Sequence, residues 1–314
     1  MVANDSGRSS FTAVRGGNQD RLVALDANLR ELAGWRTCHG LSVLDGYGWH
    51  ATSPGQGLAL ISGPDSVVLL DRAGKVAWRH EHTPWPRGCS GCAWFDVAGK
   101  PYAVVPDVSD GCAVRRLDLE SGESLAAAPL MAVPAGIHPV HQPGGWVGLS
   151  EGEGQDAARA WWVRPADRAT EGTGLRVIDA GWDDWVLSDV DPSGSRVITT
   201  SHDGGRLLVR SFPRGLRGRT AEEMKLVRHP PEFAVLQAVH VPDDGCFWHE
   251  VACFAGDFIV AKLDGPAGRF VAIDRDGVIH RLDDPDDGWL VGGPDDTWFA
   301  ATSAGFRRYR LLAS

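Results

Sequence analysis

Gly48-Trp49-His50 opens a short apolar run, and the chain repeats this arrangement five more times. The equivalent tripeptides are Gly91-Cys92-Ala93, Gly136-Ile137-His138, Gly181-Trp182-Asp183, Phe247-Trp248-His249 and Gly288-Trp289-Leu290. Successive copies begin 43, 45, 45, 66 and 41 residues apart. A period in the forties, with short apolar strands and turn residues inside each unit, is typical of a β-propeller. We therefore expect an all-β fold that consists of a single propeller.

A second repeat lies inside these units and predicts β-hairpins. An aliphatic run that ends in Asp is followed by a turn and by a strand that ends near an aromatic residue or His. The copies are Leu22–Asp26 with Trp35, Val67–Asp71 with Trp78, and Phe270–Asp274 with His280. Aliphatic residues favour the strands, while Asp and Gly favour the turn between them.

Val186–Val209 (VLSDVDPSGSRVITTSHDGGRLLV) reads as strand, Pro-Ser-Gly turn, strand, Asp-Gly-Gly turn and strand. This unit resembles the bacterial propeller repeats of the WD40-like and PQQ-like kinds. The resemblance covers most of the chain at the level of the repeat, and it implies an architecture rather than an activity. The Trp-Asp and Gly-His signatures of eukaryotic WD40 repeats are absent at the expected repeat ends, so a conventional scaffold role is not implied.

The tripeptides also bear on the number of blades. Six copies favour six blades, and the sixth blade would join strands from both ends of the chain, so that N- and C-terminal strands close the ring. The expected strands outnumber those of six four-stranded blades, and seven blades therefore remain an alternative. We expect residues 1–10 to be disordered and residues 11–314 to form the single propeller domain.

Charge and composition exclude some classes of partner. A net charge of −10 argues against nucleic acid or an anionic membrane as the main partner. The N-terminal MVANDSGRSS has no apolar core, and no later stretch approaches the roughly 18 apolar residues of a membrane span. The six cysteines do not form a dense framework and are expected to be reduced. The sequence thus predicts a soluble, cytoplasmic protein.

The third residues of the tripeptides are candidates for a site at the centre of the ring. The innermost strand of each blade lines the central channel, so equivalent residues converge on one axis. His50, His138 and His249 occupy this position in alternate repeats, and Asp183 occupies it in another. These four are the candidate catalytic residues. The three histidines are also candidate ligands of one transition metal ion, Zn, Fe, Cu or Mn.

Tryptophans beside these positions predict a restricted apolar pocket that would suit a small molecule. The candidate ligand-binding residues are Trp49, Trp182, Trp185, Trp248 and Trp289. The alternative is structural: Trp and His at the start of an inner strand would pack between blades and satisfy backbone groups.

Gly148-Leu-Ser150-Glu-Gly152 matches the GxSxG pattern of a catalytic serine. A nucleophile elbow needs a turn from a strand into a helix, whereas here a strand leads into a polar loop, so we reject this interpretation.

Two functions from different classes remain open. The first is a small-molecule-binding propeller with an axial pocket of His and Trp, with or without metal-assisted catalysis. The second is a protein-interaction scaffold of the WD40-like type, without catalytic activity, that holds a protein partner at its rim. The first is favoured because the polar residues recur at one equivalent position. The sequence does not decide whether the protein is an enzyme.

Overall fold

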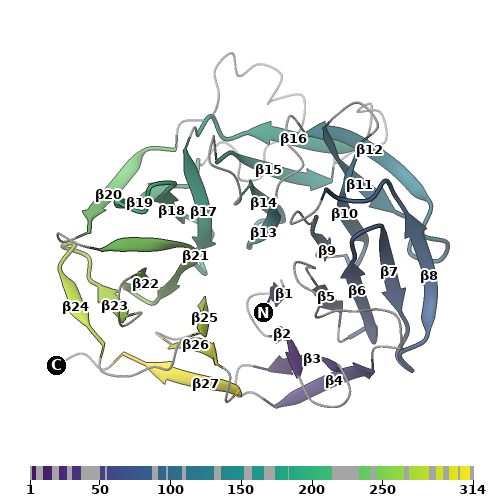
Figure 1. Ribbon diagram of the computed structural model, residues 1–314, viewed down its shortest axis with the longest axis horizontal. Helices are drawn as coiled ribbons and strands as arrows, with labels where there is room; N and C mark the ends of the chain where they lie inside the picture. The colour runs from purple at the N-terminus through teal and green to yellow at the C-terminus, as the bar shows by residue number, and fades with distance from the viewer. Residues whose placement is uncertain are drawn as a thin grey trace.

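The computed structural model describes most of the chain as strands and turns (Figure 1). The described residues are 2–4, 10–15, 21–26, 30–36, 50–53, 55–86, 91–96, 98–107, 111–130, 136–151, 158–165, 174–182, 184–213, 233–241, 245–264, 269–282, 288–292, 297–302 and 305–311. These ranges contain strands and no helix. The predicted all-β class is therefore confirmed.

The described strands form seven antiparallel sheets, each made of strands that follow one another in the chain. The first sheet contains β1 (Val2–Asn4), β2 (Ser10–Arg15), β3 (Arg21–Asp26) and β4 (Glu31–Arg36). The second contains β5 (His50–Ser53), β6 (Leu58–Ser62), β7 (Ser66–Leu70) and β8 (Val76–Glu81). The third contains β9 (Ala93–Phe95), β10 (Pro101–Pro106), β11 (Cys112–Leu117) and β12 (Ser124–Leu130).

The remaining sheets follow the same scheme. The fourth contains β13 (Ile137–Gln142), β14 (Trp146–Glu151), β15 (Ala160–Pro165) and β16 (Leu175–Asp179). The fifth contains β17 (Trp185–Val190), β18 (Arg196–Ser201), β19 (Arg206–Ser211) and β20 (Val235–His240). The sixth contains β21 (Cys246–Ala255), β22 (Phe258–Asp264), β23 (Arg269–Ile273) and β24 (Ile279–Arg281). The last is three-stranded, with β25 (Gly288–Gly292), β26 (Thr297–Thr302) and β27 (Gly305–Arg310).

The sheets are arranged around a common centre, and the first strand of each sheet is innermost (Figure 1). Neighbouring first strands contact one another, as β5 does with β9, β13 with β17, and β17 with β21. This is the arrangement of a β-propeller, as the period of the sequence predicted.

The two ends of the chain depart from the expectation of one shared sheet. β1–β4 and β25–β27 form separate sheets, which take neighbouring places in the ring (Figure 1). The first strand, β1, pairs with β2 from Val2↔Thr12 to Asn4↔Ser10. The N-terminal segment therefore supplies a four-stranded sheet by itself, and the described strands form seven sheets.

Side chains on the outermost strand of one sheet tie it to the next sheet. Trp35 Nε1 of β4 donates to the Gly57 carbonyl at 3.3 Å, and Trp78 Nε1 of β8 donates to the Leu119 carbonyl at 2.8 Å. These are the tryptophans of the hairpin repeat. Each such bond contributes about 1 kcal/mol, in addition to the burial of the indole ring.

The four described cysteines, Cys92, Cys112, Cys246 and Cys253, are thiols and not disulfides. Within the described ranges, no helix has the length and hydropathy that crossing a membrane requires.

Candidate functional site

His138 is the candidate histidine whose side chain the structure describes, and it reaches across to the next sheet. It lies on β13, is only 4% exposed, and donates from Nε2 to the Leu187 carbonyl of β17 at 2.8 Å. Its cross-strand neighbour Ser150 accepts a hydrogen bond from the Leu187 N–H at 2.9 Å. Two side chains of one sheet therefore hold both backbone groups of one residue in the next.

The position of Leu187 explains why these bonds form. β17 pairs with β18 on one side only, so its other edge presents backbone N–H and C=O groups that need partners. Leu187 is fully buried, and water cannot supply them. His138 and Ser150 thus have the structural role that the sequence left open as an alternative for His138. Ser150, the serine of the GxSxG pattern, thus accepts a backbone hydrogen bond from the next sheet.

For the other candidate polar residues the structure describes at most the position on a strand. His50 is the first residue of β5, and His249 lies on β21 in the stretch where its pairing with β22 shifts register. Only the strand positions of these two histidines are described, and Asp183 lies outside the described residues. The fold thus brings His50, His138 and His249 to the first strands of three sheets, β5, β13 and β21.

The described side chains place a limit on how a metal ion could be held. They contain no group of three or more His, Cys, Asp or Glu side chains arranged as a metal site. In the neutral ring of His138, Nε2 carries the donated proton, so Nδ1 has the lone pair that a metal would need. His138 therefore stays a candidate ligand through Nδ1, beside His50 and His249, and Asp183 is a further candidate.

The candidate tryptophans lie in different places. Trp182 is buried between the fourth and fifth sheets, with its ring 4.8 Å from the ring of Phe233. Trp185 opens β17 and is partly exposed. Trp248 and Trp289 are strand positions on β21 and β25, and Trp49 lies outside the described residues.

Two arginines that sequence reasoning missed stack on these tryptophans. The Arg210 guanidinium carbon is 5.1 Å from the Trp182 ring and 5.0 Å from the Trp185 ring, and that of Arg206 is 5.2 Å from the Trp185 ring. We call Arg206, Trp185, Arg210 and Trp182 the Arg–Trp stack. Residues 206 and 210 share one face of β19 because their separation is even, and this spacing opposite a tryptophan is the signal that the sequence contained.

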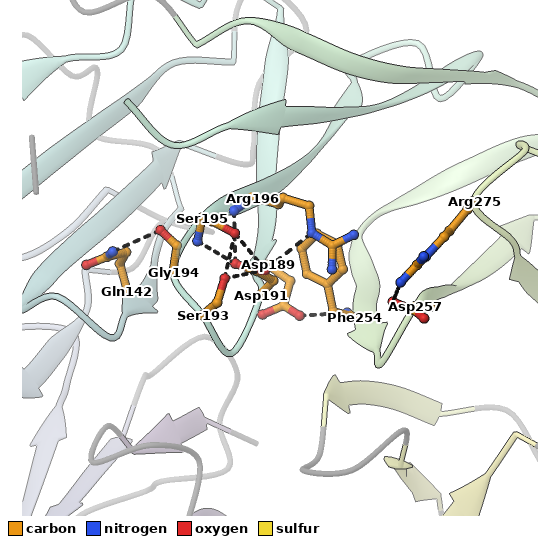
Figure 2. Close-up of polar contacts among 10 residues, drawn as sticks. All are labelled: Gln142, Asp189, Asp191, Ser193, Gly194, Ser195, Arg196, Phe254, Asp257 and Arg275. Carbon is orange, nitrogen blue, oxygen red and sulfur yellow. Dashed lines mark hydrogen bonds and ion pairs between the residues drawn. The ribbon is translucent and has the colours of Figure 1, made fainter. Parts of the chain in front are cut away.

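A second polar cluster joins the fourth, fifth and sixth sheets (Figure 2). Asp191 accepts backbone hydrogen bonds from Ser195 and Arg196 at 2.6 and 2.9 Å and forms an ion pair with the Arg196 side chain at 3.2 Å. The cluster is tied to both neighbouring sheets. Gln142 Nε2 donates to the Gly194 carbonyl at 3.1 Å, and the Phe254 N–H donates to Asp189 at 2.8 Å. These bonds connect the fourth sheet to the fifth and the fifth to the sixth, so the cluster stabilises the packing of the three sheets.

No protein-family model matches the sequence, and no curated protein sequence is significantly similar to it. Solved structures are similar in fold. PorZ, of the type-IX secretion system of Porphyromonas gingivalis, has 13% identity and a TM-score of 0.58 over 96% of this chain and 45% of that chain. Dihydro-heme d1 dehydrogenase NirN in complex with DHE has 13% identity and a TM-score of 0.52 over 99% of this chain. The WD40 domain of SCAP from fission yeast has 9% identity and a TM-score of 0.51, covering 95% of this chain and 77% of that domain.

These likenesses define the class of the protein and no more. At identities of 9 to 13%, they show the propeller fold and confirm the repeat-level resemblance to WD40-like and related propellers. The chain spans 65% of the NirN chain, less than two thirds of it. The same fold hosts proteins of different function, so activity has to be argued from this chain's own residues.

Proposed function

We propose that this protein binds a small molecule or a metal ion at the centre of its ring, with His50 and His249 as the contacting residues. The observation that carries the proposal is the placement of these histidines on β5 and β21, the first and innermost strands of their sheets. His138 lies on β13, the first strand of the fourth sheet, and would contribute through Nδ1, because its Nε2 is engaged with Leu187.

The similar structures support the general kind of partner. NirN was solved in complex with DHE, so a protein with this fold accommodates a small molecule. A metal ion held by His50, His249 and Asp183 would act as a Lewis acid toward water or a ligand oxygen, and neutral imidazoles would be its nitrogen ligands. Trp248, next to His249 on β21, and Trp289, on the first strand β25 of the last sheet, would supply apolar walls.

The metal form of the proposal is tested by titrating metal-depleted protein with Zn²⁺ and with Mn²⁺ in a calorimeter. We expect one equivalent to bind and the double variant His50→Ala/His249→Ala to lose the binding. His280→Ala is the matched control, because His280 lies on the outer strand β24 and contacts Asp274 at 2.8 Å. Equal binding by the double variant and the wild-type protein would contradict the proposal.

A second candidate function, a protein-interaction scaffold, is favoured by a different observation. Apolar side chains about half exposed lie on or beside the outermost strands of five sheets: Leu32, Val76, Leu125, Val235, Leu236 and Val278. Apolar groups on a rim are the usual contacts of a protein partner. In that case a complex isolated with the wild-type protein should be lost in Leu236→Asp and kept in His50→Ala/His249→Ala. The reverse pattern would rule out the scaffold.

A further inference from the structure

The Arg–Trp stack contains two guanidinium groups that form no ion pair within the described part of the chain. Arg206 is exposed, Arg210 is half-buried, and both lie against the ring of Trp185. Neither forms an ion pair with a carboxylate of the described part of the chain.

Two other arginines of the same molecule, one stacked and one exposed, are paired with carboxylates. Arg196 lies 4.9 Å from the Phe254 ring and also forms its ion pair with Asp191, and Arg275 pairs with Asp257 (Figure 2). Stacking on an aromatic ring therefore does not prevent an arginine of this protein from acquiring a carboxylate partner.

The hydrogen-bond donors of the stack are also largely unused. Arg210 donates from Nε to the neutral Thr199 hydroxyl at 3.2 Å, and among the described residues its terminal NH₂ groups have no acceptor. Arg206 has no hydrogen-bond acceptor within that part of the chain either. The nearby Asp203 carboxylate attracts Arg206 electrostatically, but among the described residues it accepts its hydrogen bonds from the Ser201 hydroxyl and the Gly205 N–H and none from Arg206.

The stack holds the guanidinium groups in place. Trp182 is buried against Phe233, and Trp185 begins β17, so Arg210 lies against one buried indole and one partly exposed indole. Burial lowers the pKa of Arg210, which marks a cation that has lost part of its hydration without gaining a counter-ion. A planar, oriented and partly desolvated guanidinium is the group best suited to bind an oxyanion through two parallel N–H bonds.

We propose that Arg206 and Arg210 form a binding site for a small oxyanion, the phosphate or carboxylate group of a metabolite, at the interface of the β13–β16 and β17–β20 sheets. This site is separate from the one proposed at the ring centre and does not depend on it. The two indoles supply the walls, and the two guanidinium groups supply the charge and the donors.

The test is a calorimetric titration of the full chain with pyrophosphate and, separately, with citrate at low ionic strength. We expect at least one of the two anions to bind with an affinity that falls as salt is added. Binding of pyrophosphate alone identifies phosphate as the recognised group, and binding of citrate alone identifies carboxylate. Failure of the wild-type protein to bind either anion would overturn the proposal.

Variants locate the binding. Arg210→Gln and Arg206→Gln should each weaken it at least tenfold, whereas Arg275→Gln, which removes the same charge from an exposed pair, should leave it unchanged. Arg206 is exposed, so its variant should fold normally even if the loss of Arg210 disturbs the sheet interface. His50→Ala/His249→Ala should bind the anion like the wild-type protein. Equal weakening by Arg206→Gln and Arg275→Gln would show a general charge effect and contradict the site.

Discussion

His138 matches the repeated tripeptide of the sequence, and in the structure it also connects two neighbouring sheets through its side chain. The repeat placed it at the third position of its tripeptide, where equivalent residues were expected to face the ring axis. Its ring instead donates to Leu187 of the next sheet, and Ser150 receives the N–H of the same residue. The sequence could not show this, because the direction of a side chain depends on how two sheets pack against each other.

Removing either partner of Leu187 should therefore destabilise the fold. We expect His138→Ala and Ser150→Ala each to lower the free energy of unfolding by about 1–3 kcal/mol, because each leaves a buried backbone group without its bond. Urea unfolding followed by circular dichroism measures this. Ser188→Ala is the matched control, since the Ser188 hydroxyl makes only a 3.5 Å contact with Thr200. Losses no larger than that of the control would show that the Leu187 bonds do not stabilise the protein.

His82 should make stability depend on pH. Burial lowers the pKa of the His82 ring. The Thr83 carbonyl, which accepts the Nδ1 proton of His82, raises this pKa and opposes the effect of burial. Among the described residues, Nε2 of His82 has no hydrogen-bond partner. His80 and Arg115 lower the pKa further, whereas Asp65 raises it. Because the folded-state pKa lies below the ordinary value of 6.5, the unfolded chain takes up the proton more readily. The contribution of His82 is then complete above about pH 6.5 and is lost as the pH falls below it.

The corresponding experiment compares urea midpoints at pH 7.5 and pH 5.5. The wild-type protein should lose stability between the two, and His82→Asn, which keeps a donor for Thr83 but cannot be protonated, should lose less. Identical changes in the two proteins would exclude His82 as the source.

At the scale of the elements, the Asp–Gly turns follow directly from the sequence. In the β7–β8 hairpin the Asp71 carboxylate accepts the N–H groups of Ala73 and Lys75, and the Gly74 N–H donates to the Asp71 carbonyl. The β23–β24 turn repeats this with Asp274, Val278 and Gly277. These contacts are local, so they could be predicted without knowledge of the packing.

Gly122 adds a tertiary constraint to such a turn, and a pair of variants should separate the two effects. Gly122 (φ +74°) and Gly145 (φ +86°) both have left-handed backbones, but only at Gly122 would a Cβ atom meet a neighbour, the Trp78 ring at 2.7 Å. We expect Gly145→Ala to cost about 1–2 kcal/mol from backbone strain alone. Gly122→Ala should cost more, because it also displaces the indole that donates to Leu119. Equal losses in urea unfolding would show that the Trp78 contact adjusts freely.

At the scale of the whole molecule, the repeated tripeptide located the centre of the ring. His50, Ala93, His138, His249 and Leu290 all lie on first strands, and one residue separates the tripeptide at 181–183 from β17. The first sheet has no such tripeptide, which is why counting copies favoured six blades. The Arg–Trp stack was missed because it joins residues on β17 and β19 and in the segment before β17, which only the folded sheet brings together.

The central claim, that the ring binds a ligand through His50 and His249, is tested most directly by native mass spectrometry of the protein as purified. The wild-type protein should carry a species of defined added mass that is released on denaturation. That species should be absent from His50→Ala/His249→Ala and present in His280→Ala. A wild-type mass equal to that of the polypeptide alone, or an added mass that the double variant keeps, would contradict the claim.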